Sequence, residues 1–194
     1  RQLINSAVIA RYLKQLLQND LRYAPFTFIA SEMEVDEPID IQTPKGVIKS
    51  RIGGIIDRMD SKDGTLRIVD YKTGGTPKTP ENIEQLFTPA DNRPNYIFQT
   101  FLYAAILCRK QSLKVAPSLL YIHRAASESY SPVIEMGAPR QPKVPVNNFA
   151  FFEDEFRERL HGLLQEIFSQ EETFSQTEDT RKCEYCDFRS LCKR

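Results

Sequence analysis

Hydrophobic residues recur along the chain at two kinds of interval, and each kind predicts a different element. Apolar side chains three and four positions apart form one stripe of a helix, and this spacing predicts helices over residues 3–22, 96–109 and 151–168. Runs of β-branched and aromatic residues bounded by turn residues predict strands over 26–36, 47–57, 65–72 and 116–123, with a short ordered piece at 133–136. The predicted order is therefore one helix, three strands, a helix, a strand and a final helix.

Composition adds the size and class of the protein. With 194 residues, 41% of them hydrophobic, the chain can bury a core without disulfides, so we expect one domain over residues 1–194. Lys+Arg 26 and Asp+Glu 26 cancel, which argues against coating nucleic acid by bulk charge but allows a local basic groove. No apolar run reaches bilayer length and no secretory signal is present, so we predict a cytoplasmic protein without a membrane partner. The abrupt start at Arg1 suggests the C-terminal part of a longer protein.

Two carboxylates are predicted to meet across a hairpin. The Asp63-Gly64 pair is a strong signal for a tight turn, and with these as its central residues the register brings Asp57 opposite Asp70. Directly opposed carboxylates repel at Cβ separations of roughly 4.5–5.5 Å, and a divalent cation would reverse that sign. Lys72 lies two residues beyond Asp70 and so shares its face of the strand. We expect all three side chains on one face.

These three groups suit the hydrolysis of phosphodiesters. Hard oxygen ligands with open positions favour Mg²⁺ or Mn²⁺, which activate water beside a phosphate. Lys72 would orient the water, help to deprotonate it or stabilise the developing charge on the phosphate, and the sequence leaves these roles open. The alternative is a set of ordinary solvated side chains. The acid at the facing position, Asp57, favours a site.

Four segments in this order resemble the RecB-like and AddB-like nucleases of the PD-(D/E)XK superfamily. The segments are GGIIDRMD at 53–60, IVDYKTG at 68–74, QTFLY at 99–103 and C-x2-C-x5-C at 183–192. The resemblance implies a restriction-endonuclease-like α/β (α+β) fold, with a mixed central sheet flanked by helices. It also implies that Asp57, Asp70 and the Tyr71 main-chain carbonyl hold the catalytic metal, and that Lys72 serves the water.

The resemblance assigns further residues to the same site. Gln99 and Tyr103 would support the site and contact backbone phosphates, and their spacing of four places both on one side of a helix. Tyr103 reads equally well as a core residue. Glu32 is the favoured candidate for a further acidic metal ligand on the first strand, with Glu34 the weaker one.

Three cysteines close to the C-terminus form a tail, residues 181–194, that needs another explanation. Cys183, Cys186 and Cys192 read as metal or cluster ligands rather than disulfides, whereas Cys108 on a predicted helix reads as structural. Tetrahedral zinc and cubane clusters both need four ligands, so the set is one short. The resemblance implies a [4Fe-4S] cluster in the full-length protein, closed by an upstream cysteine, and an upstream active-site His, neither of which is present here. Zinc is the alternative.

The sequence therefore favours a metal-dependent DNA exonuclease or endonuclease of recombination or double-strand-break repair. Its partners would be DNA and a helicase or helicase-like subunit or domain. A different class, a catalytically silent DNA-binding scaffold subunit of a helicase-nuclease complex, would not need Asp57, Asp70 and Lys72 together. A third alternative is a zinc-ribbon interaction module with an unrelated body.

Overall fold

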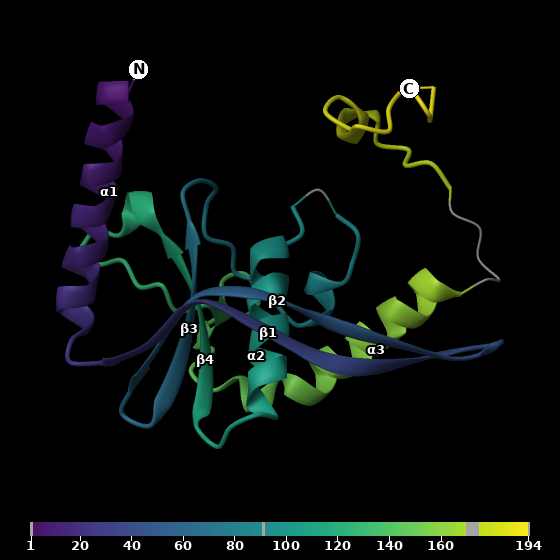
Figure 1. Ribbon diagram of the computed structural model, residues 1–194, viewed down its shortest axis with the longest axis horizontal. Coiled ribbons are helices and arrows are strands. Elements are labelled where there is room, and N and C mark those ends of the chain that lie inside the picture. The colour runs from purple at the N-terminus through teal and green to yellow at the C-terminus, as the bar shows by residue number, and fades with distance from the viewer. Residues whose placement is uncertain (1, 91, 170–174, 194) are drawn as a thin grey trace.

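The computed structural model describes residues 2–90, 92–169 and 175–193, with side chains described from Ser6 onward. Within these residues the main sheet has four strands in the order β1-β2-β3-β4 (Figure 1). β1 and β2 pair antiparallel, as do β2 and β3, whereas β4 joins β3 in parallel. The strands are β1 (Thr27–Thr43), β2 (Gly46–Lys62), β3 (Thr65–Lys72) and β4 (Lys114–Tyr121).

Helices cover both faces of this mixed sheet. The helices are α1 (Gln2–Tyr23), α2 (Asn95–Cys108), which connects β3 to β4, and α3 (Glu153–Phe168). Short 3-10 turns lie at Glu84–Leu86, Ile122–Arg124, Phe149–Phe151 and Thr180–Cys183, and β5 (Glu135–Met136) pairs with β6 (Val144–Pro145). The predicted fold class, a mixed sheet flanked by helices, is confirmed.

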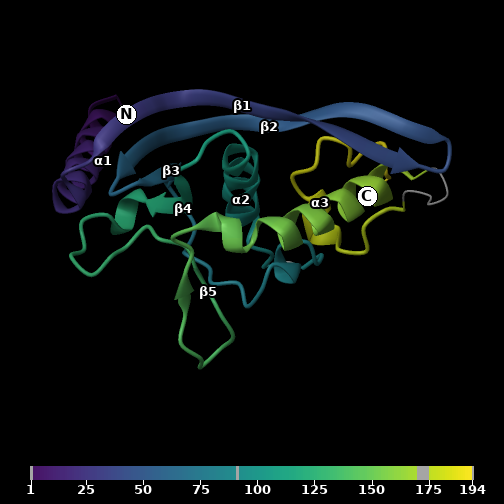
Figure 2. The same cartoon turned by 90° about the horizontal axis from the view of Figure 1, so that it is seen from below.

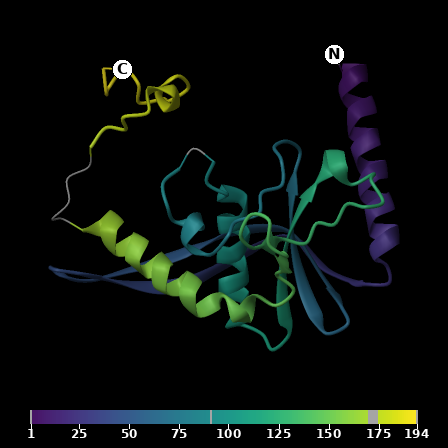
Figure 3. The same cartoon turned by 180° about the vertical axis from the view of Figure 1, so that it is seen from behind.

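Alternation along β3 assigns the two faces. Ile68 belongs to the main core beneath α2 and α3, where Phe101 and Phe156 are fully buried. Val69, pointing the other way, joins a smaller cluster against which α1 packs Leu16. Figure 2 shows α2 and α3 on one side of the long β1–β2 ribbon, and Figure 3 shows α1 at the end of the molecule opposite the C-terminal tail.

The predicted third strand, 65–72, matches β3, and the helices agree within two residues. The first two strands run further than predicted. The prediction for β1 stops at Asp36, yet Ile39 and Ile41 continue the alternation and are buried. The predicted piece at 133–136 is shorter, since Val133 makes only an isolated bridge before β5.

The side of helix α1 that faces the sheet is not its most apolar side. Gln15 and Asn19 are buried against the sheet, whereas the leucine-rich stripe is exposed. Asp20 fixes this orientation, because it lies 2.7 Å from the Arg58 guanidinium of β2. The exposed stripe consists of Ile9, Leu13, Leu17 and Leu21.

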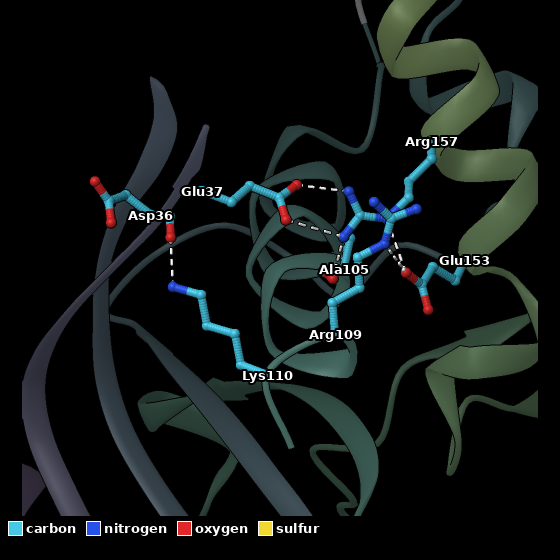
Figure 4. Close-up of polar contacts among 7 residues, drawn as sticks. All are labelled: Asp36, Glu37, Ala105, Arg109, Lys110, Glu153 and Arg157. Atoms are coloured by element: carbon cyan, nitrogen blue, oxygen red, sulfur yellow. Dashed lines mark hydrogen bonds and ion pairs between the residues drawn. The ribbon is translucent and has the colours of Figure 1, made fainter. Parts of the chain in front are cut away.

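A buried arginine joins α3 to the sheet and to α2 (Figure 4). Arg157 is 6% exposed; its guanidinium lies 2.5 Å from Glu37 of β1 and 2.8 Å from Glu153, and also donates to the Ala105 carbonyl. Because a buried cation needs such partners, this cluster fixes where α3 crosses the β1–β2 ribbon.

Candidate active site

The predicted hairpin register is present. Lys62 pairs with Thr65 and Arg58 pairs with Val69, where the ladder ends. Extended by one step, the same register would place Asp57 opposite Asp70. The turn is made by Asp63 at φ 49° and Gly64 at φ 73°, the left-handed conformations that a two-residue hairpin requires.

Asp70 and Lys72 form the centre of the candidate site. Asp70 is 4% exposed, and the Lys72 ammonium lies 2.5 Å from its Oδ2 atom. This ammonium is therefore the charged partner of the buried Asp70 oxygen among the described residues. Burial raises the pKa of Asp70, Lys72 opposes that rise, and Asp57 adds to it. The site therefore holds a carboxylate that calls for more positive charge than Lys72 supplies.

Asp57 is oriented by the backbone of β3. Its Oδ2 atom accepts a 2.7 Å hydrogen bond from the Tyr71 N–H. This bond holds the Asp57 carboxylate at the end of β3, beside the position where Asp70 enters the site.

Helix α2 contributes the other predicted pair. Gln99 Oε1 lies 3.4 Å from Lys72 Nζ, and Gln99 Nε2 donates a 3.0 Å hydrogen bond to the Tyr103 hydroxyl. The predicted common side of the helix is confirmed. Tyr103 is also 6% exposed and part of the main core, so it serves both as a core residue and as the partner of Gln99.

Two residues of this region escaped the sequence analysis. Tyr96 carries the Lys72 ammonium over its ring, 4.2 Å from the centroid. Its spacing of three from Gln99 was the available signal. Gly54 leaves room for Tyr103, because a Cβ there would come within 2.6 Å of the hydroxyl. The glycine pair at 53–54 was the signal for this close approach.

Glu32 lies on β1 between the residues paired with Ile56 and Arg58, at the register position that faces Asp57. It is exposed and has a φ of 50°. Its role as a metal ligand stays a prediction. Within the described residues no three His, Cys, Asp or Glu side chains form a group that could hold a metal ion. This holds for Cys183, Cys186 and Cys192 as well, and all four cysteines are free. Residue 194 of the predicted tail lies outside the described residues.

Cys108 packs against the main core, in agreement with a structural role. Burial raises the pKa of its thiol to about 11, which keeps it in the uncharged form near neutral pH. His123 and His161 are both exposed.

The donor set fits a hard divalent cation. Two carboxylates on one face, one of them buried, are the ligands that Mg²⁺ and Mn²⁺ accept alongside water and phosphate. Asp57, Asp70 and the Tyr71 carbonyl are the groups that would hold it.

The chain matches the model of the PD-(D/E)XK nuclease superfamily over residues 2–193, and it belongs to this superfamily. It is also similar to one of the subunits of the ATP-dependent helicase/deoxyribonuclease from Streptococcus uberis, with 29% identity over 121 residues. That match covers 60% of this chain and 9% of the relative, so the chain spans a small part of the relative's length.

Among solved structures, the crystal structure of SSO0001 is 15% identical and has a TM-score of 0.29, with 83% of this chain and 59% of that chain covered. This likeness is too weak to add to the fold assignment. Among the described residues, none of the helices combines the length and apolar character that a bilayer crossing requires.

Proposed function

We propose that this chain is a Mg²⁺- or Mn²⁺-dependent deoxyribonuclease that hydrolyses phosphodiester bonds in recombination or double-strand-break repair. One observation carries the proposal: the buried Asp70 carboxylate, the Lys72 ammonium 2.5 Å from it and the Asp57 carboxylate held by the Tyr71 N–H gather at the end of β3. Superfamily membership supports a nuclease-type activity. The helicase/deoxyribonuclease relative supports a helicase or helicase-like partner.

The residues divide the work of the proposed reaction. Asp57 and Asp70 would hold the cation, which would lower the pKa of a water and neutralise phosphate charge. Lys72, whose ammonium lies beside Asp70, would place its charge near the attacking water or the phosphate. Gln99 positions Lys72 through the 3.4 Å contact, and Tyr103 fixes Gln99.

The cysteine tail carries a separate proposal. Cys183, Cys186 and Cys192 would supply three thiolates to a [4Fe-4S] cluster in the full-length protein, or to zinc, with the fourth ligand elsewhere. Because these sites need four ligands, the tail alone does not complete either one.

The nuclease proposal is tested by cleavage of linear and circular DNA in Mg²⁺, Mn²⁺ or EDTA. We expect Asp70→Asn and Lys72→Met to lower the cleavage rate at least a hundredfold, since each removes a group acting on the reacting phosphate, a contribution of about 10²–10³. Asp57→Asn should do the same and also weaken Mn²⁺ binding measured by calorimetry.

Matched controls lie on the far half of the β1–β2 hairpin. Asp40 and Lys49 pair with each other there and are exposed, so Asp40→Asn and Lys49→Met should cleave like the parent chain. Wild-type activity in either Asp70 or Lys72 variant would show that the site is misassigned. A parent chain that binds DNA but never cleaves it would favour the scaffold alternative.

A further inference from the structure

The parallel pairing of β3 and β4 opens a hollow next to the candidate active site. Lys72 and Tyr121 are register partners, so both strands end at the same edge of the sheet. The segments that follow them, 73–80 and 122–135, wall a hollow of about 580 Å³. Ligands of open α/β sheets commonly bind outside the carboxyl ends of parallel strands, where such segments separate.

A second hollow lies next to this one. Its volume is about 310 Å³, and it shares Lys78 and Tyr121 with the first. Tyr96, which carries the Lys72 ammonium over its ring, is part of its lining. Gly75, at φ 80°, lies between the Tyr96 and Tyr121 rings, 3.5 and 3.8 Å from a Cβ built there. Tyr96, over whose ring the Lys72 ammonium lies, and Tyr121, which lines both hollows, therefore place the larger hollow beside the candidate active site.

The wall of the larger hollow is tied to the sheet. The Tyr130 hydroxyl accepts a 2.8 Å hydrogen bond from the Tyr121 N–H and donates a 2.9 Å one to the Leu119 carbonyl. The Leu119 N–H bonds the Pro132 carbonyl, and Ser118 bridges to Val133. Because these bonds already fix the loop, a ligand would meet a preformed surface and lose less entropy on binding.

Lys78 does not face the hollow as a free cation. Its ammonium donates to the carbonyls of Asn92 and Arg93, at 2.7 and 3.1 Å, which fixes the wall between the two hollows. The exposed cation is Arg124, which has no ion-pair partner among the described residues.

The lining combines aromatic, hydroxyl and cationic groups. His123 is exposed at the rim, and its ring stands 6.1 Å from the buried Tyr121 ring in an edge-to-face arrangement. The hydroxyls come from Ser127, Ser129 and Ser131, and one carboxylate, Glu135, is present. Aromatic platforms beside cations are typical of surfaces that bind unpaired nucleic acid, because every base has a face that stacks and every linkage carries a charge.

We propose that the hollow at the carboxyl end of β4 binds an unpaired nucleotide of the DNA strand next to the scissile phosphate. The base stacks on His123, and Arg124 pairs with the adjoining phosphate. The inference rests on the nuclease proposal for its orientation, but it concerns binding, which is measured separately from cleavage. A base held in a duplex cannot enter the hollow, so the subsite selects a frayed or single strand.

The test measures binding of a fluorescent oligothymidylate by anisotropy, with Ca²⁺ replacing Mg²⁺ and with EDTA as a second condition. We expect His123→Ala and Arg124→Gln each to weaken single-strand binding roughly five- to a hundredfold, the range for loss of one stacked base. Arg124→Gln should also reduce the slope of log K against log salt by about 0.7, as expected for one phosphate contact, whereas His123→Ala should leave that slope unchanged.

Matched controls are His161→Ala on α3 and Arg140→Gln in the β5–β6 loop, both at exposed positions. They should bind like the parent chain, and blunt duplex should bind equally to His123→Ala and the parent. Parental single-strand affinity in both hollow variants, or no single-strand binding by the parent, overturns the subsite. Cleavage that persists in those variants with affinity unchanged leaves the nuclease proposal intact. Binding losses in a chain that never cleaves would refute the nuclease proposal alone.

Discussion

Three neighbouring groups surround the Lys72 ammonium. The Asp70 carboxylate holds its ammonium, the Tyr96 ring lies beneath it, and the Gln99 carbonyl oxygen lies 3.4 Å away. If the proposed metal ion bound Asp70, the Tyr96 ring and the Gln99 amide would still hold the Lys72 ammonium. Metal binding would then not leave the charge of Lys72 without a neighbour.

This balance predicts opposite effects of two substitutions on the metal-free chain. Burial raises the pKa of Asp70, so its ionised form is unfavourable, and Asp70→Asn should raise the Tm measured in EDTA. Lys72→Met leaves that carboxylate without its ammonium and should lower the Tm, by roughly 2–4 °C for each kcal/mol lost. Differential scanning calorimetry compares the two. A clear drop in Tm for Asp70→Asn would contradict the facing arrangement of Asp57 and Asp70.

Secondary-structure elements show how far the sequence could predict the site. The register of β2 and β3 followed from Asp63-Gly64, because a two-residue turn fixes every pair beyond it. The Gln99 and Tyr103 pair followed from helical spacing. Tyr96 and Gly54 did not follow, because a tyrosine beside a lysine and a glycine opposite a tyrosine depend on how α2 crosses the sheet.

Helix α1 illustrates a different limit of prediction from the sequence, namely which side of a helix packs on the sheet. Its apolar stripe predicts an amphipathic helix, but not which side meets the sheet. The Asp20–Arg58 ion pair and the packing of Tyr12 and Leu16 against the smaller cluster decide that side. Arg58 lies on β2, far along the chain, so local spacing carries no information about this pair. The same reason applies to Arg157, whose partners Glu37 and Glu153 could not be paired from sequence.

The Arg157 cluster allows a prediction for the packing of α3. Arg157→Ala should lower the free energy of unfolding by about 3–5 kcal/mol, because it leaves the largely buried Glu37 and Glu153 carboxylates without their shared cation. Urea unfolding followed by circular dichroism measures the change. The control is Arg159→Ala, two positions along the same helix, where the partly exposed pair with Glu155 should contribute only about 0.3–0.5 kcal/mol. Equal losses in both variants would contradict the role given to Arg157.

At the scale of the whole molecule, the core that stabilises the fold lies away from the cysteine tail. The core lies between the sheet and α2 and α3, whereas Tyr185, Phe188 and Leu191 of the tail are 89%, 66% and 79% exposed. Apolar residues this exposed contribute little by burial. The tail lies at the end of the molecule opposite α1 (Figure 1), so a cluster that includes its cysteines would order a distant part of the structure rather than support the hairpin.

This separation predicts how the chain responds to loss of its tail thiols. The triple variant Cys183→Ser, Cys186→Ser and Cys192→Ser should have a free energy of unfolding within about 0.5 kcal/mol of that of the parent, as for other substitutions at exposed positions.

Anaerobically purified parent chain should contain iron and sulfide well below one cluster per chain, because a cubane needs four ligands and the tail offers three. The two measurements together test whether this chain holds a complete cluster. A near-stoichiometric cluster in the parent chain and a lower Tm in the triple variant would require a fourth ligand within this chain. Cys108 would then be the first residue to replace, since loss of the cluster in Cys108→Ser would show that α2 rearranges to bring its buried thiol to the tail.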